Sequence, residues 1–459
     1  MIPLQQIDFG KGSIASVMVR SSAPMLVAQL LNLLYSIVDR IYIGRLPEIG
    51  QAALGAVGIC FPIVLIITAF TNLFSSGGAS LAAIAWGEGN SRKSETFMNT
   101  SFYLLVISSV ILGITGIVLA APILEAFGAE PDSVSMARGY LQIYLCGTFF
   151  SMVALGLNSY LNAQGRFGAG MLSILIGALC NLLLDPLFMF VFGWGIQGAA
   201  LATVLSQFLS FVYVMSCMFG RKAFWKLHGP QKRWFQWPVI QSITALGLAS
   251  FVMQLSNSLV QIVSNAMLIR VGSTLFVTVM TIVNSVRQIT DTVVFAIGDG
   301  CSPMLGYCYG AGDYGRLRKA ILLMAEVLIG YTCLIWVLIL LFPQVLIGLF
   351  NQDPVLMEAA LPALKTYFFA YLFQAFQYTG QTVFKALNFR KQAIFFSLLR
   401  KVFIVVPLIY ILPHFWQPPV YGVFASEPVS NVIGGTACLL TMIFTVYLPL
   451  KEGRLKKAA

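Results

Sequence analysis

Long apolar runs separated by short polar segments restrict the fold of this chain more than any other feature. Six runs occupy the first half, at residues 14–44, 53–80, 97–121, 134–161, 168–192 and 196–220. Six more follow, at residues 239–268, 274–300, 317–343, 356–386, 391–413 and 420–449. A helix needs about 20 apolar residues to cross the hydrocarbon core of a bilayer. The pattern therefore predicts an all-α membrane protein with twelve transmembrane helices.

Composition excludes the other broad classes of protein. Charged residues make up only 10% of the 459 residues and hydrophobic residues make up 58%, whereas soluble domains are about 25% charged. A disordered chain would show the opposite balance. The net charge of +11 does not indicate a nucleic-acid partner. The basic residues lie between the apolar runs, as the positive-inside rule requires.

Alternate loops are basic, and this predicts the orientation. Lys and Arg cluster after the second, fourth, sixth, eighth and tenth runs and in the tail. The loop at residues 221–238 also carries Trp225, Trp234 and Trp237, which we expect at the headgroup boundary. Both termini are therefore expected to be cytoplasmic, in a multi-pass protein of the cell membrane.

The two halves of the chain repeat each other at an offset of 223 residues. Gly77 matches Gly300, Tyr144 matches Tyr367, and the loop GEGNSRK at 87–93 mirrors GAGDYGR at 310–316. Each half holds six runs, so the halves point the same way as parallel repeats, an arrangement typical of transporters. We predict four segments: an N-lobe (1–220), a basic cytoplasmic linker (221–238), a C-lobe (239–449) and a cytoplasmic tail (450–459).

Polar side chains inside the apolar runs of the first half are functional candidates, because burying them in a membrane is costly. Asn181 and Asp185 are four residues apart and share one helix face. Helical rise from the outer ends places four of the candidates at a common depth of about 9–12 Å, with Asn181 one turn deeper. The candidates are Asp39, Tyr140, Asn181, Asp185 and Thr203.

Each of these positions has an alternative interpretation. Asp39 could pair with Arg40, although sequence neighbours do not share a helix face. Asn181 and Asp185 could bind neighbouring helices together through hydrogen bonds. Pro24 lies in the same run as Asp39 and frees a carbonyl group, so it is either a functional bend or a static kink.

The second half does not copy this set. Arg287 and Asp291 are four residues apart, and we favour an internal salt bridge between them. Glu427 lies opposite Thr203 in the repeat. It could pair with Arg400 and Lys401, or it could attract a cationic substrate.

These features resemble the multidrug and toxic compound extrusion (MATE) family over nearly the whole chain. The resemblance rests on the two six-run repeats and on four stretches of sequence. They are VDRIYIG with Asp39, the paired GEGN and GAGD loops, GCSPMLGYCYGAGD, and NLLLDP followed by GIQGAALAT. The family implies a V-shaped pair of six-helix lobes that export organic cations in exchange for H⁺ or Na⁺.

The resemblance also implies roles for individual residues. The cation site of the family's N-lobe carries over to Asp39, Asn181, Asp185 and Thr203, which would be metal ligands only if the coupling ion is Na⁺. Tyr140 matches a tyrosine beside that site, and Pro24 matches a bending proline. Some branches also carry C-lobe carboxylates, but Gln254, Gln377 and Gln381 occur in the corresponding runs.

The sequence thus predicts a secondary active antiporter that works by alternating access. Its expected partners are small organic cations and the lipid bilayer, with no nucleic acid, as a monomer without a cofactor other than the coupling ion. The alternative is a flippase for lipid-linked oligosaccharides from the same broad superfamily, against which the acidic N-lobe argues. An enzyme is not expected, because no catalytic motif lies within the runs.

Overall fold

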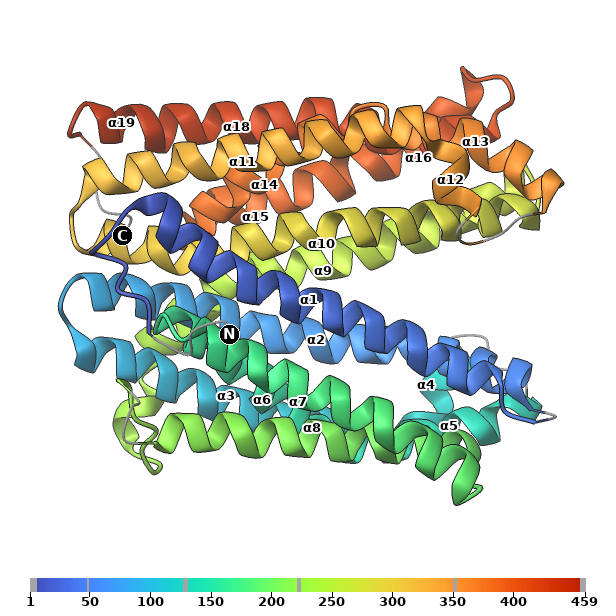
Figure 1. The fold of residues 1–459 in the computed structure, drawn as a ribbon, viewed down its shortest axis with the longest axis horizontal. Helices are drawn as coiled ribbons and strands as arrows, with labels where there is room; N and C mark the ends of the chain where they lie inside the picture. Colours follow the sequence, from blue (N-terminus) through green and yellow to red (C-terminus); the bar gives the residue numbers. More distant parts are fainter. Residues whose placement is uncertain are drawn as a thin grey trace. The chain divides into compact units, whose positions relative to one another are not determined.

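Each of the twelve apolar runs forms helix in the computed structural model, which describes residues 6–47, 49–126, 131–220, 224–348, 350 and 353–454 (Figure 1). Residues 221–223 of the predicted linker and 455–459 of the predicted tail lie outside the described residues. The helices of the first half are α1 (Ile14–Gly44), α2 (Gly50–Gly87), α3 (Ser91–Val118), α4 (Ala120–Ala126), α5 (Pro131–Cys146), α6 (Thr148–Ala163), α7 (Phe167–Pro186), the π-helical turn η1 (Leu187–Val191) and α8 (Gly195–Phe219).

The second half follows a short 3₁₀ turn, η2 (Lys232–Phe235). Its first helices are α9 (Trp237–Val271), α10 (Thr274–Gly310), α11 (Tyr314–Leu341), α12 (Pro343–Gly348), α13 (Pro354–Phe368), α14 (Leu372–Ala386) and α15 (Arg390–Leu398). The rest are η3 (Leu399–Val405), α16 (Val406–Ile411), η4 (Leu412–His414), α17 (Val420–Ser430), η5 (Asn431–Gly435), α18 (Thr436–Met442), η6 (Ile443–Tyr447) and α19 (Leu448–Lys451).

Length and hydropathy confirm the all-helical membrane fold. Within the described residues, nine helices are long and apolar enough to cross a membrane. Two further pairs, α5 with α6 and α13 with α14, satisfy the same test together and are bent by 51° and 47°. The remaining predicted run, 274–300, forms α10, which carries Arg287, Asp291 and Asp299 and is not among these eleven.

The helices form two compact units whose borders fall inside α1 and α9. Unit 1 comprises Met1–Lys11 and Ala23–Gly247, and unit 2 comprises Gly12–Ser22 and Leu248–Ala459. The first turns of α1 therefore pack with the second half of the sequence, and the first turns of α9 pack with the first half. The borders lie at corresponding places, because α1 and α9 are the first helices of the two repeats.

Paired glycines permit close backbone contact in both units. In unit 1, a Cβ atom on Gly247 of α9 would collide with the backbone of Leu73 on α2, and one on Gly77 would collide with α9. In unit 2, a Cβ atom on Gly300 of α10 would lie 2.8 Å from the Cα atom of Ser22 on α1. Small residues let membrane helices approach this closely. The repeat thus builds the same crossing twice, at Gly77 and at Gly300.

The segment before α9 packs onto unit 1 and buries two of its three tryptophans. Trp225 and Trp234 are 0% and 1% exposed, whereas Trp237 is 71% exposed. Asn99 of α3 holds the segment, because its side chain donates to the carbonyl of Lys226 (3.0 Å) and accepts from the amide of His228 (2.8 Å). Aromatic side chains bury a large apolar area when they pack against other parts of a protein, and this stabilises the packing of the segment.

Candidate functional site

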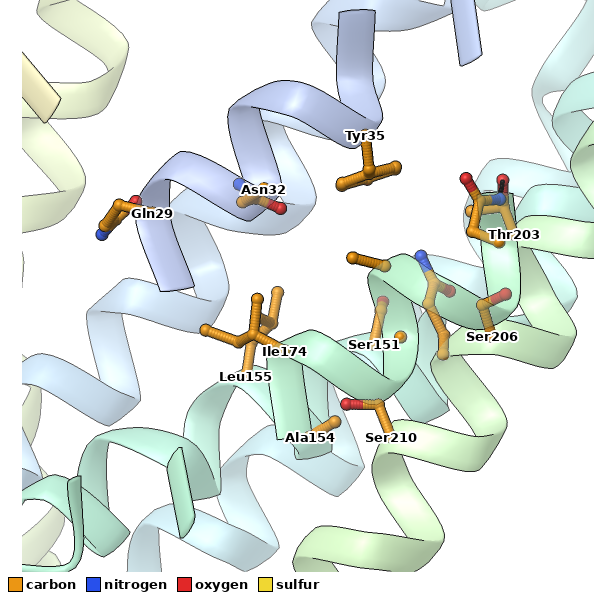
Figure 2. Close-up of a pocket in the computed structure, with 14 residues that line it drawn as sticks. Gln29, Asn32, Tyr35, Ser151, Ala154, Leu155, Ile174, Thr203, Ser206 and Ser210 are labelled. Atoms are coloured by element: carbon orange, nitrogen blue, oxygen red, sulfur yellow. Dashed lines mark hydrogen bonds between the residues drawn. The ribbon is translucent and has the colours of Figure 1, made fainter. Parts of the chain in front are cut away.

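Helix α1 presents a row of polar side chains to the interior of unit 1. Gln29, Asn32, Tyr35 and Asp39 are spaced three or four residues apart and therefore lie along one face. Figure 2 shows the first three of them on α1, with Ser151 on the opposite side of a cavity. An apolar helix that carries such a row directs it toward protein or water, because lipid offers no hydrogen-bond partners.

Asn181, Asp185 and Thr203 form a hydrogen-bonded chain between α7 and α8. The Asn181 amide donates to Asp185 Oδ1 (3.1 Å) and to Thr203 Oγ1 (3.3 Å), and the Thr203 hydroxyl donates to the carbonyl of Ala199 (3.0 Å). Asp185 is 1% exposed and Asn181 is 3% exposed. Because both N–H groups of Asn181 are taken, its carbonyl oxygen is the group left to bind a ligand.

Asp39 and Asp185 bring two carboxyl groups face to face. Within the part of the chain that the structure describes, Asp39 Oδ1 and Asp185 Oδ2 are buried and receive no hydrogen bond. Two carboxylates in contact repel each other unless a proton or a cation is shared between them. The pair is therefore arranged to take up positive charge.

The cation of Arg40 attracts the Asp39 carboxyl group but forms no ion pair with it. The Arg40 guanidinium lies over the ring of Phe61, 5.8 Å from its centroid, and is exposed. No ion pair of Asp39 occurs among the described residues. Tyr140 of α5 lies beside Asp39 and stacks on Tyr144, with ring centroids 6.3 Å apart. The structure thus brings together all five polar candidates from the first half.

A cavity of about 230 Å³ adjoins the carboxyl pair. Asn181 and Thr203 belong to its wall. The Asn181 amide contacts Asp185 directly, and Thr203 is linked to the pair only through Asn181. Its described lining contains no charged side chain and is rich in amides and hydroxyls. These lining residues are Gln29, Asn32, Tyr35, Ser151, Ala154, Leu155, Ile174, Gly177, Ala178, Asn181, Thr203, Ser206, Gln207 and Ser210.

The chemistry of this site suits a proton or a small hard cation. It offers two carboxyl groups and the oxygens of an amide and a hydroxyl, and oxygen ligands are typical for hard cations. The described residues contain no group of three or more His, Cys, Asp or Glu side chains that could hold a metal ion.

The polar residues of unit 2 form a separate cluster. Arg287 Nε lies 3.6 Å from Asp291 Oδ2, so the predicted salt bridge is present. Glu427 pairs with Lys401 at 2.7 Å and with Arg400 at 3.6 Å. This agrees with the first of its two interpretations, an ion pair with these two residues. All five side chains lie on α10, η3 and α17.

The glutamines of unit 2 serve other contacts. Gln377 and Gln381 of α14 donate to the carbonyls of Phe396 and Ala393 on α15, and so they join helices. Gln254 of α9 is half-buried, and its backbone carbonyl accepts from the hydroxyl of Ser258 (3.3 Å). Among the described residues, no hydrogen bond joins the Gln254 side chain to the charged side chains of this cluster.

Sequence reasoning missed most of the cavity wall. Tyr35 lies near both Asp39 and Asp185, and Gln207 contacts Tyr144. The regular spacing of Gln29, Asn32 and Tyr35 before Asp39 was a usable signal. Ser206 and Ser210 of α8 carry no comparable signal, because single serines are common in membrane helices.

Comparison with known proteins gives concordant matches. A family model described as MatE matches residues 24–187 and 249–411. An FAD transporter of Shewanella oneidensis is 24% identical over 434 residues, which cover 93% of each chain. The multidrug export protein MepA of Staphylococcus aureus is 23% identical over 450 residues, 96% of this chain and 95% of that protein. An outward-facing multidrug resistance MATE family transporter of the MOP superfamily has a TM-score of 0.90 at 22% identity, covering 98% of this chain and 99% of that one.

Proposed function

The chain belongs to the MatE family of transporters, and from this membership we propose that it is a secondary active antiporter that exports organic cations in exchange for H⁺ or Na⁺. It is a multi-pass membrane protein, and the family consists of transporters and not of enzymes. The name of one relative, MepA, specifies multidrug export, and that of another specifies FAD transport. The acidic site of unit 1 supports organic cations as the substrate class.

One observation carries this proposal. The carboxyl groups of Asp39 and Asp185 lie close together, and Asn181, which lines a neutral polar cavity with Thr203, donates a hydrogen bond to Asp185. A coupling ion and a substrate that share wall residues cannot bind independently. The transport of the ion and that of the substrate are coupled when each ligand binds one state of the site more tightly than the other. The states differ in protonation or in conformation.

The exchange proceeds through alternate occupation of this site. With the site open to the outside, H⁺ or Na⁺ binds to the carboxyl pair and lowers its negative charge by one, which weakens its attraction for a cationic substrate in the cavity. The substrate leaves outward. With the site open to the cytoplasm, the coupling ion leaves and the regained negative charge attracts the next substrate.

Helix α1 is the element that we expect to respond. It runs without interruption from Ile14 to Gly44 and carries both Pro24 and Asp39. Proline has no N–H group, so the carbonyl of Arg20 lacks its helical partner and the helix bends there at low cost. We propose that loss or gain of charge at Asp39 shifts α1 between two curvatures. Both termini are cytoplasmic in this proposal.

A fluorescent cation tests the proposal directly. Everted membrane vesicles that contain the protein should accumulate ethidium when a pH gradient or a Na⁺ gradient is imposed. Asp39→Asn and Asp185→Asn should abolish accumulation at unchanged expression, because the site can no longer take up the coupling charge. Glu88→Gln, in the loop after α2, is the matched control and should retain transport. Full export by Asp39→Asn would contradict the mechanism.

The second candidate, a flippase for lipid-linked oligosaccharides, would need a strongly cationic cavity. The described lining of the cavity in unit 1 contains no Lys or Arg. Transport of ethidium by the wild-type protein would exclude a flippase that is restricted to lipid-linked sugars.

A further inference from the structure

Three cationic side chains of unit 2 converge on a single carboxylate oxygen. Lys401 Nζ lies 2.7 Å from Glu427 Oε1, Arg400 NH2 lies 3.6 Å from it, and Arg287 NH1 lies 3.8 Å from it. Arg287 also pairs with Asp291, whose Oδ1 accepts hydrogen bonds from the Tyr371 hydroxyl and the Gln374 amide. We call the five charged side chains, Arg287, Asp291, Arg400, Lys401 and Glu427, the charge cluster.

The charge cluster is not balanced. It contains three cations and two carboxylates, a net charge of +1, and no other carboxylate of the described residues lies within 4 Å of its cations. Lys401 and Glu427 are 4% and 5% exposed at the side chain. Isolated charge is expensive to bury, and buried ions normally have a counter-charge. When all five groups are ionised, the cluster therefore lacks one negative charge.

Space for that charge lies beside Arg287. A cavity of about 30 Å³ is lined by Arg287, Lys401 and Glu427 of the cluster and by Asn257, Ser264 and Asn284, among others. A single ordered water needs about 10–15 Å³ measured in this way. The cavity thus has room for one small ion and excludes a large organic molecule.

A polar path connects this cavity with the surface of unit 2. Asn257, Gln261 and Asn265 lie four residues apart along α9 and share one face. Asn284 of α10 donates to Gln261 Oε1 (2.9 Å), and Gln261 donates to Asn265 Oδ1 (3.2 Å). Arg287 is 24% exposed at its side chain, more than any other member of the cluster. An ion can therefore reach the cluster past side chains that offer it N–H donors.

The backbone around the cluster is unusual in a way that fits a binding site. Arg400 and Lys401 lie on the π-helical turn η3, and Asn431, which accepts a hydrogen bond from Arg400, lies on the π-helical turn η5. Sequence neighbours on an α-helix do not face the same partner, yet both cations of η3 reach Glu427. Single π-helical turns occur frequently at functional sites.

We propose that unit 2 binds one small monovalent anion in the cavity beside Arg287, where it completes the charge cluster. Chloride and the carboxylate of a small organic acid share the required chemistry, a single negative charge that accepts several N–H and O–H hydrogen bonds. The anion site is separate from the Asp39–Asp185 pair of unit 1 and stands whether or not that pair couples transport to H⁺ or Na⁺.

Thermal unfolding of the purified full-length protein in different sodium salts tests the proposal. Sodium gluconate, whose anion is too large for the cavity, is the reference. Chloride and bromide should raise the unfolding temperature in a saturable way if an inorganic anion is the occupant, and formate should do so if a small organic acid is. Equal stability in all four salts would overturn the proposal.

Charge variants distinguish binding in the cluster from a general salt effect. Arg287→Gln removes the spare positive charge and should weaken the apparent anion affinity about tenfold or more, whereas Glu427→Gln adds one and should strengthen it by a similar factor. Arg287→Gln removes two ion pairs and Glu427→Gln removes three, so a merely structural role would move both in the same direction. Arg270→Gln, at the exposed end of α9, is the matched control and should leave the affinity unchanged.

Locating the bound anion by crystallography tests the proposal without any variant, and so it remains decisive if a variant fails to fold. Crystals of the wild-type protein grown in bromide should show an anomalous peak beside Arg287. Bromide peaks elsewhere only, with none in this cavity, would overturn the proposal.

Discussion

Asp39→Asn and Asp185→Asn should each stabilise the protein against heat when both carboxyl groups are ionised and no coupling ion is present. The two groups face each other and their inner oxygens receive no hydrogen bond from the described residues. Two unit charges 4 Å apart repel each other by about 4 kcal/mol at an effective dielectric constant of about 20. Because Asp39 is only half-buried, water screens part of this energy.

We therefore expect each single substitution to add about 2 kcal/mol to the free energy of unfolding of unit 1. In a body of about 200 residues this raises the unfolding temperature by about 4–8 °C. The double variant should gain no more than either single variant, because the repulsion exists only once. The double-mutant cycle of Asp39 and Asp185 should therefore give a coupling energy of about 2 kcal/mol, with the sign expected for repulsion between the two carboxylates.

The assay is thermal unfolding of detergent-purified protein at alkaline pH in a sodium-free buffer. Added Na⁺ should stabilise the wild type but not the variants if Na⁺ is the coupling ion. If H⁺ is the coupling ion, only acidification should remove the difference between wild type and variants. Glu88→Gln is the control, since surface substitutions usually change stability by less than about 0.5 kcal/mol. Destabilisation by both single variants, with no response to Na⁺ or pH, would refute the reasoning.

Three further outcomes are expected. Asn99→Ala removes two hydrogen bonds to the segment before α9. Because each bond contributes about 1 kcal/mol, hydrogen exchange at the His228 amide should accelerate about 30-fold. Thr96→Ala on the same helix is the control and should not change the exchange rate. Asn181→Ala should uncouple the two ligands of unit 1, so that ethidium still binds in a fluorescence titration but its affinity no longer depends on pH or Na⁺; an unchanged dependence would show that Asn181 is not the link. Gly247→Ala places a methyl group against the backbone of α2 and should lower the free energy of unfolding by about 1–3 kcal/mol, measured by thermal unfolding; an unchanged unfolding temperature would contradict the close approach.

The helices were predictable from the sequence because a membrane leaves few alternatives to helices long enough to span it. The bends within two of them were not. The bend between α5 and α6 falls at Gly147, and the bend between α13 and α14 falls at the equivalent place in the repeat, at Phe369–Tyr371. The second place carries neither glycine nor proline. The bend between α13 and α14 therefore has no glycine or proline at the break that could have predicted it.

The site of unit 1 was predictable because depth and helix face restrict where a polar group can lie. Helical rise alone placed Asp39, Asp185 and Thr203 at one level, and the structure brings them together. The charge cluster of unit 2 was only partly predictable. The spacing of Arg287 and Asp291 predicted their salt bridge. Pairing of Glu427 with Arg400 and Lys401 was one of two interpretations of the sequence, and both cations reach it from the π-helical turn η3. Such a turn has no period that hydrophobic patterning detects.

The borders inside α1 and α9 have a consequence for how the protein is made. The first turns of α1 enter the membrane with the first half of the chain, but their packing partners belong to unit 2 and are synthesised only after Gly247. Unit 1 in turn waits for the start of α9. Domains that are continuous in sequence fold as they leave the ribosome, the first before the second. Here the amino-terminal turns of α1 stay without their final neighbours until α10 is inserted, so neither unit finishes folding on its own half of the chain.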